Sequence, residues 1–137
     1  MIGTLIHMFF ECQLASKIWT TVAQILKGFG ITKEITAEQF LVGYSNKNER
    51  ETICSYLVIL AKSTIYFSYL KSIQNNLEPP DYNKMYLSRL NFRLSLEFFK
   101  CKRAGDIRKF NNLWLYKNVL GCIRDDDLEL YLNKYDT

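Results

Sequence analysis

The sequence predicts an all-α fold, an irregular bundle of about five helices with two long central helices. Apolar side chains recur every three or four residues along most of the 137-residue chain, which is the period of a helix with one buried face. No window of strand length shows alternating β-branched residues, so we expect no sheet. A hydrophobic content of 48% is enough for one core, and we expect a single helical domain over residues 1–137.

Two helices are predicted in the first third of the chain. Residues 13–27 carry apolar side chains at helical intervals, and Gly28 is a typical stop signal. Thr36 and Gln39 have the spacing of a capping box, which predicts a brief second helix before Gly43.

The two long helices occupy the middle of the chain. Residues 48–76 contain neither Gly nor Pro and have apolar side chains on every face, which predicts a central helix. Pro79 and Pro80 end it, because consecutive prolines cannot continue a helix. Residues 82–104 form the next long helix, with one apolar stripe of Leu87, Leu90, Leu94, Phe98 and Cys101.

The last part of the chain is also predicted to be helical. Beyond Gly105, an apolar pattern at helical spacing continues to Gly121. Residues 125–137 are then predicted to form an acidic tail helix that begins at Asp125, Asp126 and Asp127. Carboxylates suit the positive end of a helix dipole, and this explains the three aspartates better than a metal site does.

The first twelve residues contain half of a zinc site. His7 and Cys12 stand in a His-x4-Cys spacing, and Trp19 follows seven residues later. A structural zinc needs four ligands, and a Cys pair normally precedes such a histidine. We therefore expect an empty site and no cofactor, since zinc would bind only if the missing ligands came from elsewhere.

The segment from Leu5 to Trp19 resembles the second half of the zinc-binding segment that follows the reverse transcriptase in polyproteins of LINE-type (non-LTR) retrotransposons. In that family a Cys pair precedes His-Leu-Phe-x-x-Cys and a helix with a Trp. Residues 57–66 and 108–114 are similar to the rest of the same carboxy-terminal region. The resemblance implies an amino-terminally truncated fragment in which residues 1–12 are the remnant of a zinc knuckle. It also implies contact with template RNA or target DNA.

Charge is distributed unevenly along the chain. The net charge is +4, but residues 81–124 hold ten Lys or Arg against three acidic residues, whereas residues 125–137 carry a local charge of −4. Such a basic segment fits contact with phosphates of RNA or single-stranded DNA, although it equally fits a solvated helix face. The candidate residues are Arg89, Arg93, Lys100, Lys102, Arg103, Arg108 and Lys109, of which Arg89, Arg93 and Lys100 lie within about 40° on one helix.

Aromatic residues near these cations have two interpretations. Tyr86, Phe92, Phe99 and Trp114 could stack on exposed bases. Phe92, Phe98, Phe99 and Trp114 also have helical spacing, which is more typical of a core.

Several other functions find no support in the sequence. His7 is the one histidine and has no nucleophile in a motif beside it, and no glycine-rich phosphate loop is present, so we expect no enzyme. The most apolar stretch, residues 56–61, is interrupted by Lys62 and is too short to cross a membrane. Four widely separated cysteines indicate free thiols, and we expect an intracellular protein of the cytoplasm or nucleus.

A competing hypothesis gives the chain no nucleic-acid role. It would be a helical protein-interaction module, or a decayed structural module, whose apolar faces still pack. An exposed apolar segment of Leu5, Ile6, Phe9 and Phe10 would then favour self-association.

Overall fold

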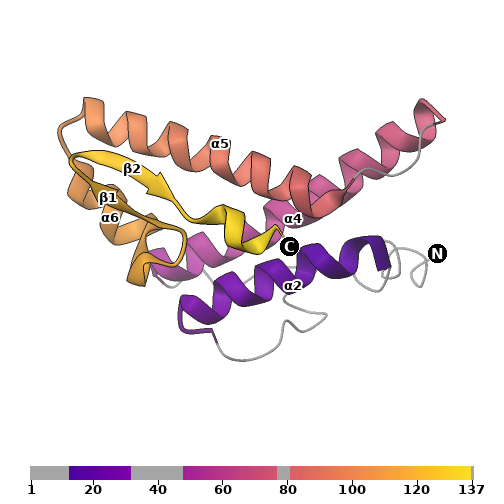
Figure 1. Ribbon diagram of the computed structural model, residues 1–137, viewed down its shortest axis with the longest axis horizontal. Coiled ribbons are helices and arrows are strands. Elements are labelled where there is room, and N and C mark those ends of the chain that lie inside the picture. The colour runs from indigo at the N-terminus through magenta and orange to yellow at the C-terminus, as the bar shows by residue number, and fades with distance from the viewer. Residues whose placement is uncertain (1–12, 32–47, 77–80, 137) are drawn as a thin grey trace.

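The computed structural model describes residues 13–31, 48–76 and 81–136, and helices dominate these ranges (Figure 1). The α-helices are α2 (Gln13–Gly28), α4 (Glu49–Gln74), α5 (Tyr82–Arg103) and α6 (Ile107–Trp114). Two strands, β1 (Gly121–Arg124) and β2 (Asp127–Leu130), follow, with short 3-10 helices η2 (Tyr116–Asn118) and η3 (Leu132–Tyr135). The mainly helical class is confirmed, but these ranges hold four α-helices and a small sheet instead of about five helices.

The two long central helices are present where the sequence predicted them, and each begins at a side-chain cap. Asn48 accepts a hydrogen bond from the Glu51 backbone N–H at 2.9 Å, at the start of α4. Asp81 accepts one from the Lys84 backbone N–H at 3.1 Å, at the start of α5. These caps satisfy amide groups that have no partner within the first turn of a helix.

α4 and α5 contact each other and cross at an angle in Figure 1, and α2 contacts both helices. The core lies where the three helices meet. On α5, Leu87, Leu90, Leu94 and Phe98 are buried as predicted, whereas Cys101 is half-buried. Fully buried side chains from the other helices complete this core: Ile18, Val22 and Ile25 on α2, Leu57, Val58 and Ile65 on α4, and Phe110 on α6.

A buried asparagine joins three elements within this core. Thr21 on α2 donates its hydroxyl hydrogen bond to the Asn83 side-chain oxygen at 2.6 Å. Asn83 in turn donates from Nδ2 to the Tyr135 carbonyl oxygen in η3 at 2.9 Å. Since Asn83 is 1% exposed, these two bonds satisfy an amide that water cannot reach.

The carboxy-terminal prediction was wrong, because residues 121–130 form a hairpin and no acidic tail helix begins at Asp125. β1 and β2 pair antiparallel, with Gly121 opposite Leu130. Asp125 and Asp126 form the two-residue connection at φ values of 53° and 63°. Both values lie in the left-handed region that a type I′ turn requires, and aspartate tolerates that region better than most residues do.

The helix that was predicted to reach Gly121 ends at Trp114 instead. Lys117 and Asn118 have left-handed backbones, with φ values of 51° and 56°, so an α-helix cannot continue through them. The chain instead turns at this point and leads into the hairpin. The brief helix predicted from Thr36 and Gln39 lies outside the described residues.

α4 also has the length and apolar composition of a membrane-spanning helix, with a mean hydropathy of 1.4 over its most apolar window. In the fold, 56% of that window is buried. Because the core helix of a bundle meets the same criteria, this composition does not by itself indicate a membrane. The prediction that no segment crosses a bilayer stays a prediction.

Candidate nucleic-acid interface

The seven cations predicted to contact phosphate divide into two groups in the fold. Arg89 and Arg93 lie in the middle of α5, where they reach α4. The other five lie where α5 ends and α6 begins, and we call this group the basic corner: Lys100, Lys102, Arg103, Arg108 and Lys109.

Arg89 is held between the two long helices. Its Nη1 donates hydrogen bonds to Thr64 Oγ1 at 2.8 Å and to Ser63 Oγ at 3.2 Å, both on α4. The side chain is half-buried. The helical spacing correctly placed Arg89 and Arg93 on the same side of α5. In this part of α5, that side faces α4.

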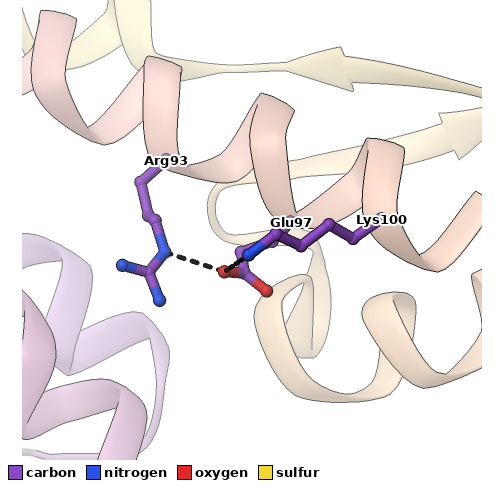
Figure 2. Close-up of polar contacts among 3 residues, drawn as sticks. All are labelled: Arg93, Glu97 and Lys100. Carbon is purple, nitrogen blue, oxygen red and sulfur yellow. Dashed lines mark ion pairs between the residues drawn. The ribbon is translucent and has the colours of Figure 1, made fainter.

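Figure 2 shows that Arg93, Glu97 and Lys100 meet on the surface of α5. Arg93 Nε lies 2.9 Å from Glu97 Oε1, and Lys100 Nζ lies 3.8 Å from the same oxygen. Arg93 Nε is buried and lacks hydrogen-bond geometry, so its contact with the carboxylate is an ion pair without a hydrogen bond. The guanidinium also lies 4.9 Å from the centroid of the Tyr56 ring on α4. Tyr56 and Glu97 therefore hold the Arg93 guanidinium beside α4, and Glu97 links it to Lys100 of the basic corner.

The basic corner forms because the chain turns sharply between α5 and α6. Gly105, with a φ of 74°, provides the left-handed residue that ends α5. Asp106 then caps α6, accepting a hydrogen bond from the Lys109 backbone N–H at 3.2 Å. The last turn of α5 and the first turn of α6 thus present their cations at one place on the surface.

Carboxylates neutralise only part of this corner. Lys102 Nζ lies 3.3 Å from Asp127 Oδ1 in the hairpin. Within the described ranges, none of the ion pairs includes Arg103, Arg108 or Lys109, and all three side chains are exposed. Three cations of the corner are therefore open to an anionic ligand.

The helix dipole explains some of these cations but not all. Lys100, Lys102 and Arg103 lie in the last turn of α5, where positive charge is favourable. Arg108 and Lys109 lie in the first turn of α6, where the dipole makes positive charge unfavourable. Local helix stability therefore does not account for these two residues.

Of the four candidate aromatic residues for stacking on bases, the structure buries two and exposes two. Tyr86 and Trp114 are buried, so they cannot stack on bases, and the core interpretation of Trp114 and Phe98 is confirmed. Phe92 and Phe99 are 72% and 55% exposed, so the core interpretation was wrong for them. Phe99 lies beside the corner, with the Arg103 guanidinium 5.9 Å from its ring centroid.

The cysteines of the described residues show no zinc chemistry. No group of three or more His, Cys, Asp or Glu in the described ranges could hold a metal ion. Cys54 is buried, and burial raises the pKa of its thiol to about 11, which keeps it protonated and unreactive. Cys122 Sγ accepts a hydrogen bond from the Tyr131 hydroxyl at 2.8 Å. His7 and Cys12 lie outside the described residues, so the incomplete zinc site stays a prediction.

We expect EDTA to leave the helical circular dichroism and the melting temperature unchanged. A zinc site on which the fold depended would contribute on the order of 10 kcal/mol to folding. The core of α2, α4 and α5 instead relies on apolar side chains. For the same reason, the double change His7→Ala and Cys12→Ala should have little effect on the melting temperature. Stoichiometric zinc in the purified protein, lost together with the fold in this double variant, would contradict the prediction.

A comparison of the chain with protein-family models, with curated proteins and with solved structures found no match.

Proposed function

We propose that this chain is a non-catalytic nucleic-acid-binding module whose basic corner contacts the phosphates of RNA or single-stranded DNA. One observation carries the proposal: Arg108 and Lys109 stand exposed at the positive end of α6, beside the cations that end α5. This arrangement is locally unfavourable, and a bound polyanion would make it favourable.

The chemistry of the corner favours a single-stranded nucleic acid. Its lysines and arginines can pair with successive phosphates without reading a sequence. The exposed Phe99 ring supplies an apolar surface next to Arg103, on which an unstacked base can lie. Bases within a duplex are already stacked and are not available for this contact.

The retrotransposon context belongs to the same proposal. The resemblance of residues 5–19 to the zinc-binding segment after the LINE reverse transcriptase supports a fragment that holds template RNA or target DNA beside the polymerase. The basic corner includes Arg108 and Lys109, which open one of the later stretches that carry the resemblance. In this context the chain binds nucleic acid and leaves the chemistry to the reverse transcriptase.

Fluorescence anisotropy with labelled RNA and labelled single-stranded DNA tests the proposal. The test variant is Arg103→Gln, Arg108→Gln and Lys109→Gln, which removes the three cations of the basic corner that appear in no ion pair of the described residues. We expect affinity at low salt to fall about tenfold and the salt slope of log K to fall by about 2, since each single-strand phosphate contact contributes roughly 0.7.

A triple variant with the same net charge is the control. Lys17→Gln, Lys27→Gln and Lys84→Gln removes three exposed lysines from α2 and from the first turn of α5. We expect this variant to bind nearly as the parent chain does. Equal losses of affinity in both triple variants would show that binding depends on net charge and not on the basic corner. No binding by the parent chain would favour the competing hypothesis of an interaction module without a nucleic-acid role.

A further inference from the structure

The exposed apolar side chains of this protein are concentrated on one pair of helices. Among the side chains that the structure describes, the large apolar ones that are exposed lie on α4 or α5. Exposed apolar side chains concentrated on one pair of helices can mark an interaction site. These residues, which we call the α4–α5 face, are Ile59, Tyr66, Phe67, Tyr69 and Ile73 on α4 and Met85, Phe92, Leu96 and Phe99 on α5.

The face has the spacing that a partner helix requires. Ile59, Tyr66 and Ile73 recur every seven residues along α4, and Met85, Phe92 and Phe99 do so along α5. A repeat of seven keeps side chains on one line and is the pattern of helices that pack against another helix. Each line is about 21 Å long at the helical rise, which matches a partner helix of about four turns.

Each line lies opposite the buried side of its own helix. Phe92 is about 160° around α5 from the buried Leu94, and Ile59 is about 160° around α4 from the buried Ala61. Figure 1 shows α4 and α5 crossing at an angle near the start of α5, with the carboxy-terminal turns of α4 extending past the other helices. The core of the bundle is therefore already covered, and this face is an additional apolar surface.

A groove of about 450 Å³ runs between the two helices on this face. Tyr56 and Leu60 of α4 and Phe92 and Leu96 of α5 give it apolar walls, and Arg89 and Arg93 line it as well. Arg93 is paired with Glu97. Arg89 donates only to the hydroxyls of Ser63 and Thr64, and no carboxylate in the described part of the chain forms an ion pair with it.

We propose that the α4–α5 face binds an amphipathic helix of a partner protein, with apolar residues at heptad spacing and an Asp or Glu that enters the groove to pair with Arg89. The apolar residues of this helix pack on Phe92, Leu96 and Ile59. Its carboxylate supplies the charge that the half-buried guanidinium lacks. Arginine and carboxylate can form two parallel hydrogen bonds, so this pair also fixes the register of the bound helix.

Charge and shape favour this partner over the other candidates. A second copy of the chain, packed face to face, would offer Arg89 another apolar face and Glu97, which is already paired with Arg93. A nucleic acid would offer phosphates but no aliphatic side chains, and would leave the apolar residues of α4 facing water. An acidic amphipathic helix matches both the cation and the apolar lines.

A displayed peptide library tests the proposal. The probe is a set of helical peptides of about 18 residues, long enough to span four turns, with Leu, Ile or Phe at heptad positions and Asp, Glu, Lys, Gln or Ser elsewhere. We expect selection on the full chain to enrich Asp and Glu at positions that flank the apolar line. For a selected peptide, we expect Kd to rise about tenfold with Arg89→Gln and at least about tenfold with Phe92→Ser.

Three controls separate the proposal from its alternatives. Arg108→Gln removes a cation of the basic corner and should leave the Kd of the peptide unchanged. Circular dichroism should show that Phe92→Ser folds normally, because Phe92 is 72% exposed. A peptide with Gln in place of its acidic residues should bind the parent chain weakly and should lose nothing further with Arg89→Gln.

Other results would overturn the proposal. Selected peptides without an excess of Asp and Glu, or with affinities that neither variant changes, would show that the chemistry of the partner is wrong. A dimer that Phe92→Ser dissociates in analytical ultracentrifugation would show that a second copy occupies the face. Binding of a labelled single-stranded DNA that Arg89→Gln and Phe92→Ser both weaken would assign the face to nucleic acid.

Discussion

Asn83→Ala is expected to lower the free energy of unfolding by about 3 kcal/mol, because it leaves two buried polar groups without a partner. Asn83 accepts the hydrogen bond of the Thr21 hydroxyl and donates to the Tyr135 carbonyl oxygen. Each orphaned group in an apolar interior costs about 1–3 kcal/mol. Urea denaturation followed by circular dichroism measures the change.

A neighbouring asparagine on the same helix provides the control. Asn91 is exposed, and its side-chain oxygen accepts only a long hydrogen bond from Ser95 Oγ at 3.3 Å. Asn91→Ala should therefore change stability by no more than about 0.5 kcal/mol.

A double-mutant cycle separates the hydrogen bond from simple loss of packing. Thr21→Val removes the hydroxyl that Asn83 accepts from, while keeping a side chain of similar shape. We expect the effects of Thr21→Val and Asn83→Ala to be non-additive, with a coupling of about 1 kcal/mol. Additive effects would mean that the two side chains contribute independently and that the buried bond is unimportant.

The helices could be predicted from the sequence because their signals are local. Apolar periodicity, the Gly28 stop and the two prolines placed α2, α4 and α5 within about two residues of their observed ends. Residues 48–76 have apolar side chains on every face, which predicted a central helix. In the fold, one side of α4 is exposed, so the all-round apolarity reflects a second surface in addition to the core.

The hairpin could not be recognised from helical periodicity. Its strands have four residues each, which is too short for alternation to stand out from noise. Asp125-Asp126 was the available signal, since a two-residue connection with left-handed backbones favours Asp, Asn and Gly. The same residues also suit the start of a helix, and the sequence alone offered no way to choose between these two uses of aspartate.

The sequence allowed us to predict which cations belong to the candidate site, but not how the fold arranges them. Helical geometry placed Arg89, Arg93 and Lys100 on one side of α5, and the structure keeps them there. It could not show that α4 covers the first two of them and leaves Lys100 at the basic corner. The packing partner of each helix side depends on contacts between residues distant in sequence, such as Arg89 with Thr64. The exposure of Phe92 and Phe99 is unpredictable for the same reason.

Gly121→Ala is expected to lower the free energy of unfolding by about 3 kcal/mol, because a Cβ at this position has no space. An added Cβ would overlap the Glu129 carbonyl oxygen and lie 3.0 Å from Leu130 Cα, both in the backbone of β2. A flexible side chain could move aside, but these backbone atoms can move only if the two strands separate. Separation would also break the 2.8 Å hydrogen bond from the Tyr131 amide to the Leu120 carbonyl.

Gly105→Ala gives a matched control in which the strain has a different origin. Gly105 has open space around it but a φ of 74°, so alanine there meets only the left-handed penalty of about 1 kcal/mol. Urea denaturation should therefore show a larger loss of stability for Gly121→Ala than for Gly105→Ala. Hydrogen exchange should show loss of protection at the Tyr131 amide in Gly121→Ala and normal protection in Gly105→Ala. Equal destabilisation of both variants, with the hairpin amides still protected, would mean that β1 and β2 can absorb a methyl group without separating.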